Sequence, residues 1–133
     1  MQRKLSFEIE GEGVLENPTF PAIEAGLTRI NPSGPSFFIL SDDTGAYVQT
    51  AGAKARVTVE FRERDGAGFR HFVLGRASDD TTEFSIKYSG GAIRLRKNEI
   101  LSLRDAGEVF RRFFESGSIS ERFSKRETTD MFK

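Results

Sequence analysis

His71 is the single histidine of the 133-residue chain, and it is the first candidate for acid–base or metal chemistry. Histidine titrates near neutral pH and serves as a general base or a metal ligand. The chain has no cysteine and no second histidine, so it lacks the partners of a conventional transition-metal set. We therefore expect His71 to be structural or exposed to solvent.

Two aspartate pairs, Asp42–Asp43 and Asp79–Asp80, carry the oxygen ligands that calcium and magnesium prefer. Neither pair has the spaced ligands and closing glutamate of a calcium loop, and both lie in expected turns, which aspartate favours. Glu60 and Glu63 could form a glycosidase-like pair, but at this spacing they point to opposite faces of one strand. The sequence therefore predicts no catalytic, cofactor-binding or metal-binding residue.

A set of basic residues is more informative, because alternate residues of a strand share a face. If Val57, Val59 and Phe61 point into the core, the basic residues between them point outward. The set comprises Arg56, Arg62, Arg64, Lys87, Arg94 and Arg96. These residues predict either an electrostatic docking surface for an acidic partner or phosphate, or an ordinary solvated sheet face that discourages aggregation.

The composition favours a single soluble domain over residues 1–133, with 37% hydrophobic and 30% charged residues. Thirteen phenylalanines supply most of the large apolar volume. Twenty basic and twenty acidic residues give zero net charge, which argues against a dedicated nucleic-acid binder. The sequence shows no secretion signal and no apolar stretch that could span a membrane, so we expect a cytoplasmic location.

Four segments position these residues. Segment 1–35 is expected to hold a strand at Leu5–Ile9 and a short helix over 21–30 that is capped by Thr19. Segment 36–97 alternates strands with Gly- and Asp-rich turns, as in an antiparallel meander. Segment 102–117 is expected to be a helix, and segment 118–133 a polar, irregular tail held by Ile119, Phe123 and Phe132.

The expected helix at 102–117 has the clearest signature. Ser102 and Asp105 form a capping box, and Gly117 stands where a left-handed cap ends a helix. An apolar stripe along the helix must be buried against the sheet. The sequence therefore predicts an α+β fold, in which one antiparallel meander sheet of about five to seven strands packs against a C-terminal amphipathic helix and a short N-terminal helix.

Five motifs follow one another between Phe37 and Phe132, over roughly three-quarters of the chain. These are Phe38-Ile39-Leu40-Ser41-Asp42, Tyr47-Val48-Gln49, Val57-Thr58-Val59-Glu60-Phe61-Arg62, Leu101-Ser102-Leu103-Arg104-Asp105-Ala106 and Phe110-Arg111-Arg112-Phe113-Phe114-Glu115-Ser116-Gly117. In the order of these motifs the segment resembles immunity protein family one, a group of small bacterial proteins that neutralise polymorphic toxins. Members tend to have a tryptophan near the C-terminus, where this chain has Phe123.

The resemblance implies a non-catalytic protein that binds a cognate toxin as a heterodimer. The acidic residues Glu8, Glu10, Glu12 and Glu16 are an alternative docking surface to the basic set. Two other classes of function stay open. The chain could be an assembly module that pairs, or self-associates, through its sheet edges, or a small enzyme or ligand-binding protein with an apolar pocket between helix and sheet.

Overall fold

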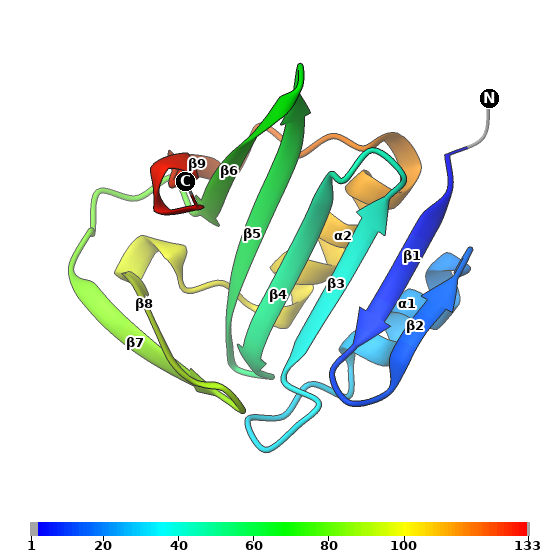
Figure 1. Ribbon diagram of the computed structural model, residues 1–133. Coiled ribbons are helices and arrows are strands. Elements are labelled where there is room, and N and C mark those ends of the chain that lie inside the picture. The colour runs from blue at the N-terminus through cyan, green and yellow to red at the C-terminus, as the bar shows by residue number, and fades with distance from the viewer. Residues whose placement is uncertain (1–2, 133) are drawn as a thin grey trace.

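The computed structural model describes residues 3–132, which form two sheets, two α-helices and two 3-10 helices (Figure 1). The strands are β1 (Leu5–Ile9), β2 (Gly13–Glu16), β3 (Phe37–Asp42), β4 (Tyr47–Ala53), β5 (Arg56–Asp65), β6 (Gly68–Gly75), β7 (Glu83–Tyr88), β8 (Gly91–Arg96) and β9 (Ser124–Glu127). The helices are α1 (Phe20–Leu27), α2 (Leu103–Ser116), and the 3-10 helices η1 (Lys97–Glu99) and η2 (Thr129–Phe132).

Seven antiparallel strands form the main sheet in the order β2-β1-β3-β4-β5-β6-β9, and β7 and β8 form a separate hairpin. The predicted α+β class and C-terminal helix are confirmed. One detail differs from the predicted single meander, since strands β7 and β8 lie outside the main sheet. The reason is that β9 occupies the edge of β6 that β7 would otherwise need.

The core lies between one face of the main sheet and α2, and both helices lie behind the sheet in the view of Figure 1. The Phe110 ring meets Phe7 edge-on at 6.5 Å between centroids, and Phe7 stacks on Phe38 at 6.0 Å. Phe113 meets Phe61 edge-on at 6.4 Å. Interlocking phenylalanine rings therefore fill the space between helix and sheet, as the thirteen phenylalanines of the sequence suggest.

Both predicted caps of α2 are present. The Ser102 hydroxyl accepts the Asp105 N–H at 3.1 Å, and the Asp105 carboxylate accepts the Ser102 N–H at 3.0 Å. Burial tends to raise the pKa of Asp105, but hydrogen bonds from Arg122 and Ser102 outweigh it and lower the pKa to about 2. Gly117 ends the helix with a φ of 76°, in the left-handed region that glycine tolerates.

The N-terminal helix α1 begins where it was expected, with the Thr19 hydroxyl accepting the Ala22 N–H at 3.3 Å. It ends at Leu27, short of the expected 21–30 range, because the following residues turn more tightly, with i→i+3 hydrogen bonds. Gly26 allows the close approach of this helix to β1. A Cβ at Gly26 would lie 2.9 Å from Cε2 of Phe7.

The segment 118–133 is not an irregular tail, and this expectation was wrong. Its residues Ser124–Glu127 form β9, which pairs with β6, and η2 follows directly. Ile119 and Phe123 are buried as expected, whereas Phe132 is 47% exposed. Strand β9, Ser-Lys-Arg-Glu, has no apolar residue, so tertiary pairing rather than hydrophobic alternation makes it a strand.

The hairpin β7–β8 packs against β4 and β5 through a small apolar cluster of its own. Ile86 and Leu95 are 5% and 4% exposed, yet they lie outside the main core. At the tip, the Ser89 N–H donates to the Ser36 hydroxyl at 2.9 Å, and the Ser89 hydroxyl donates to Glu10. These bonds attach the hairpin to the loops beside β1 and β3.

Candidate partner-binding surface

One face of the main sheet is turned away from both helices, and we call it the open face. Its residues follow from the strand register, which sets alternate side chains of β1, β3, β4 and β5 in two rows. The first row contains Glu8, Ile39, Gln49 and Glu60, and the second contains Ser6, Ser41, Tyr47 and Arg62. All eight are half-buried, so this face is polar and accessible where the helix-covered face is apolar and closed.

Arg62 lies at the centre of an aromatic cluster on the open face. Its guanidinium carbon is 3.9 Å from the ring centre of Phe69, 4.8 Å from that of Phe132 and 5.2 Å from that of Tyr47. Arginine stacked on aromatic faces is stabilised by cation–π attraction. Burial raises the pKa of Tyr47, so its phenol stays protonated at neutral pH and keeps its O–H as a donor.

His71 lies beneath this cluster and holds the side chains of Arg62 and Glu60 in place through hydrogen bonds. Its Nδ1 accepts a hydrogen bond from Nε of Arg62 at 3.2 Å, so its proton is on Nε2, which donates to Glu60 at 2.8 Å. The His71 backbone N–H donates to the Thr129 hydroxyl at 3.0 Å, and the Phe132 ring centre lies 4.3 Å from the imidazole. With 1% exposure, His71 is a structural residue that orients the surface, one of the two roles that the sequence suggested for it.

A second charged pair borders the open face. Arg126 donates two hydrogen bonds of 2.6 and 2.9 Å to the Glu99 carboxylate, and this hydrogen bonding raises the pKa of Arg126. The Glu99 carboxylate also accepts the Arg96 N–H at 2.8 Å. A cavity of about 180 Å³ lies between Arg126 and the hairpin residue Ile93, and it is also lined by Thr58, Glu60, Val73 and Phe132, among others.

The predicted basic set is divided between two sheets. Arg62 and Arg64 lie near one end of β5, whereas Arg56 lies at its start, about 26 Å from Arg64 at strand spacing. The remaining members, Lys87, Arg94 and Arg96, lie on the separate hairpin. Arg94 pairs with Glu83 at 2.6 Å. Of the six, only Arg62 is part of the aromatic cluster.

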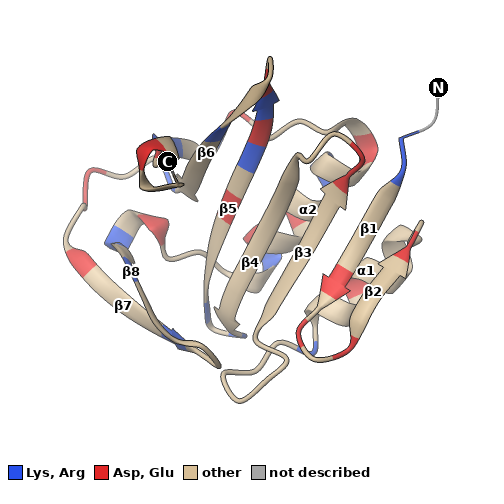
Figure 2. Cartoon of the chain, viewed as in Figure 1, with Lys and Arg blue, Asp and Glu red and all other residues tan. Residues whose placement is uncertain are grey.

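Alternation along β5 places Thr58 on the same face as Arg56 and Arg62, but Thr58 is only 2% exposed, so this face is not solvated at that position. The hairpin explains the difference, because its residues Ile93 and Leu95 border the same cavity as Thr58. Figure 2 shows the basic residues as separate bands on β5, β6 and β8 rather than as one field.

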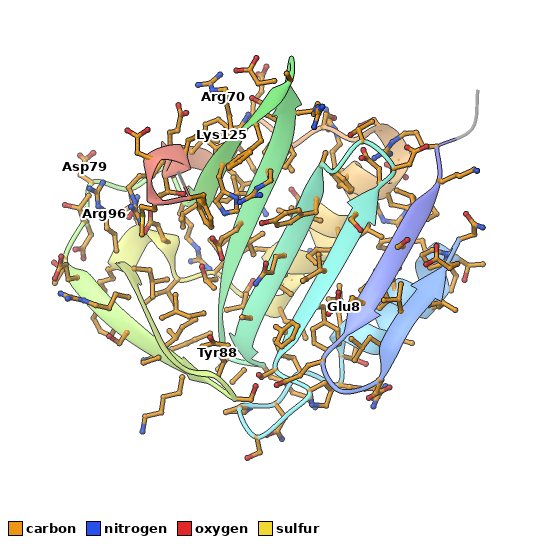
Figure 3. The ribbon with its side chains drawn as sticks, viewed as in Figure 1. Glu8, Arg70, Asp79, Tyr88, Arg96 and Lys125 are labelled. Carbon is orange, nitrogen blue, oxygen red and sulfur yellow. The ribbon has the colours of Figure 1, made fainter. Side chains whose placement is uncertain are left out.

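The predicted acidic set stays together around the β1–β2 hairpin (Figure 2). Three of its members have intramolecular partners. Glu12 pairs with Arg29, Glu10 accepts hydrogen bonds from Ser36 and Ser89, and Glu16 accepts the Ser6 hydroxyl at 2.9 Å. Glu8 differs, since its carboxylate forms no hydrogen bond or ion pair with residues 3–132. Figure 3 labels Glu8 on β1.

The hydrogen bonds lower two pKa values in this acidic set. The Ser89 hydroxyl, followed by the Ser36 N–H, lowers the pKa of Glu10, and the Arg29 hydrogen bond lowers the pKa of Glu12. Both carboxylates therefore stay ionised at neutral pH. The acidic set is a negatively charged end of a chain that has no net charge.

Local sequence patterns do not predict the aromatic cluster. Alternation along β4 and β5 identifies Tyr47 and Arg62 as neighbours only when the register between the strands is known. Phe69 follows a turn, and Phe132 reaches the cluster through η2, which no local pattern predicts.

The aspartate pairs do behave as turn residues, because Asp42 and Asp80 each accept hydrogen bonds from the threonine two residues on.

Comparison of the chain with protein-family models and with curated proteins finds no match. Over residues 3–132, no three His, Cys, Asp or Glu side chains lie together as a metal site would require. None of the helices in this range is long and apolar enough to cross a membrane. The open face and the acidic set are therefore considered on their own geometry.

Proposed function

We propose that this chain is a non-catalytic immunity protein that binds a cognate bacterial toxin in the cytoplasm and blocks it sterically. The resemblance to immunity protein family one motivates the choice of a toxin as partner. The open face would form the interface, and the product would be a heterodimer. In this proposal the protein acts through its surface, without a cofactor or a metal.

The observation that carries the proposal is the aromatic cluster around Arg62 on the open face, called the aromatic–arginine cluster from here on. Tyrosine, phenylalanine, methionine and arginine are enriched in protein interfaces, and tyrosine and arginine supply many binding hot spots. Here Tyr47, Arg62 and Phe69 are half-buried, while Met131 and Phe132 are 78% and 47% exposed. His71 and Glu60 hold Arg62 in place before any partner arrives, which reduces the entropy lost on binding.

At the open face, the size of the adjoining cavity favours a protein partner over a small ligand, whereas open surface pockets of about 330–430 Å³ lie elsewhere on the chain. The cavity beside Glu60 measures about 180 Å³, below the roughly 300–1,000 Å³ of typical ligand sites. The space between α2 and the sheet, where an apolar pocket was considered, is filled by rings such as Phe38 and Phe110, both 0% exposed. The assembly module remains a second hypothesis, which self-association without a tight partner would favour.

Co-expression with a candidate toxin, such as a toxin-like protein if the neighbouring gene encodes one, tests the proposal. The chain should restore growth to cells that make this toxin, and the two proteins should purify as a 1:1 complex. Met131 adjoins Phe132 in η2 and lines the same cavity, so Met131→Glu places a charge beside the aromatic–arginine cluster. The variant should weaken the complex at least tenfold, since one unpaired charge buried in the interface costs more than about 1.4 kcal/mol. Because Met131 is 78% exposed, the variant should fold normally.

Arg104→Glu is the matched control, because Arg104 is exposed on α2, behind the sheet, and the variant also adds negative charge. It should leave the complex intact. Equal binding by the Met131 variant and the wild type would contradict the open face as the interface. A toxin that still kills in the presence of the folded chain would overturn the pairing with that toxin.

A further inference from the structure

We propose that the outer edge of β2 binds an extended, basic segment of the protein partner, which adds a strand to the main sheet. The identity of that partner rests on the proposed function. The edge itself is a separate surface from the open face, at the opposite end of the strand order from β9. Addition of a strand to an exposed edge is a recurrent mode of peptide recognition.

The backbone of β2 has hydrogen-bonding groups available at this edge. The Asn17 N–H donates to the Leu5 carbonyl at 2.8 Å, which makes these two residues a hydrogen-bonded pair of the β1–β2 ladder. Hydrogen-bonded pairs alternate along an antiparallel ladder, so Leu15 also bonds to β1. Val14 and Glu16 therefore turn their N–H and carbonyl groups outward, away from β1. An added strand would satisfy these groups.

The side chains of β2 leave the edge accessible on both faces. All four residues of the strand are exposed, and Val14 and Leu15 are 54% and 49% exposed. Proteins usually protect such an edge with lysine, proline, a bulge or a covering segment. β2 contains no lysine or proline, and η2, the 3-10 helix beyond β9, lies at the other edge. An apolar, accessible edge is a feature that a partner strand can use.

The charge around β2 specifies a basic occupant. Residues 5–28 contain five glutamates and no lysine or arginine. Glu8 lies directly beside Val14 on the open side, where its carboxylate has no hydrogen bond or ion pair within residues 3–132. A second copy of this chain would bring the acidic ends of two β2 strands together, whereas a basic segment would neutralise them.

The register predicts the side chains of this segment. The residue opposite Leu15 would face the helix side, where an apolar side chain would cover Leu15. Its two neighbours, opposite Val14 and Glu16, would face the open side, where lysine or arginine can reach Glu8 and Glu16. The structure thus favours a basic–apolar–basic alternation in the bound segment.

The probe is a synthetic nine-residue peptide of alternating lysine and valine, and its control has glutamate in place of lysine. In two-dimensional NMR titrations the lysine peptide should shift the amide signals of Val14 and Glu16 and slow the exchange of both amide protons. The glutamate peptide should bind at least tenfold more weakly. Shifts centred on Tyr47 and Arg62, or equal binding of the two peptides, would overturn the proposal.

Val14→Pro removes one outward N–H, and proline is tolerated on edge strands because it disturbs no ladder bond there. We expect the lysine peptide to bind this variant about tenfold more weakly, because one backbone hydrogen bond to the peptide is lost and the proline ring disturbs the extended conformation of the edge. Val14→Thr keeps the N–H and should bind like the wild type. An unchanged thermal midpoint would show that both variants fold. Equal peptide binding by the two variants would contradict strand addition.

Two further outcomes separate this proposal from the proposed function. If the toxin binds the Val14→Pro variant as tightly as the wild type, the edge proposal fails while the immunity function stands. If the lysine peptide binds but no toxin is neutralised, the edge proposal stands and the immunity function fails. A dimer of the chain alone that Val14→Pro dissociates would identify a second copy as the occupant and overturn the basic segment.

Discussion

The two faces of the main sheet use the same alternation of side chains for opposite purposes. On the helix side, phenylalanine rings from β1, β3, β5 and α2 interlock and are almost fully buried. On the open side, half-buried polar side chains such as Glu60 and Arg62 form hydrogen bonds with His71, which is buried beneath them. The helix-covered face should therefore carry most of the stability, and the open face most of the binding.

The largest predicted effect is on the free energy of unfolding, when one phenylalanine is removed from each side of the sheet. Phe110→Ala removes a ring that is 0% exposed and should lower the free energy of unfolding by about 3–5 kcal/mol. Phe132→Ala, on the open side, removes a ring that is 47% exposed and should cost about 1 kcal/mol or less. Urea denaturation of both variants measures the difference. Equal losses would break the comparison between the faces.

A smaller effect tests the charged pair at the border of the open face. Arg126→Ala should cost about 3 kcal/mol, because it leaves the Glu99 carboxylate, 3% exposed, without its cation. Glu99→Gln should cost only about 1–2 kcal/mol, because Arg126 is 30% exposed and water can solvate it. Urea denaturation of each variant checks the order. A larger loss of unfolding free energy for Glu99→Gln than for Arg126→Ala would contradict the inference that Glu99 is the member of the pair that depends more on its partner.

The smallest effect concerns Asp105, the capping residue on the helix side. Its pKa is lowered from 3.8 to about 2, which corresponds to about 2 kcal/mol of stability. Because the folded-state pKa is the lower one, this contribution is present above about pH 4 and is lost as the pH falls towards 2.

The unfolding free energies of wild type and Asp105→Asn provide the measurement. The wild type should be more stable at about pH 6, and the gap should shrink by about 2 kcal/mol at about pH 2. A gap that stays constant over this range would show that the carboxylate contributes no pH-dependent stability. The Arg122→Gln variant is a useful companion, since loss of its hydrogen bond should reduce the pH dependence.

The sequence predicted the elements whose signals are local. The caps at Ser102 and Gly117, the Thr19 cap and the alternation at Val57, Val59 and Phe61 all appear in the structure. These features depend on residues within a turn or a strand of each other, so spacing and residue type suffice to identify them.

The missed elements depend on distant residues. β9 forms because β6 offers an edge about fifty residues earlier in the chain, and its own sequence, Ser-Lys-Arg-Glu, carries no strand signal. β2 is short and wholly exposed, so no buried face marks it. The aromatic–arginine cluster needs the register of β4 and β5 and the position of η2 together. Neither the strand register nor the position of η2 can be derived from residue spacing along one segment.

The separate hairpin β7–β8 also has a consequence for the order of folding. Its strands are joined by the short turn at Ser89–Gly90, so they can meet within microseconds without the rest of the chain. An isolated two-stranded hairpin is at best marginally stable, however, and its attachment at the tip uses Glu10, 79 residues away from Ser89. We expect the hairpin to form early in folding and to unfold again repeatedly. It should persist only after the pairing of β1 with β3 has brought Glu10 and Ser36 together.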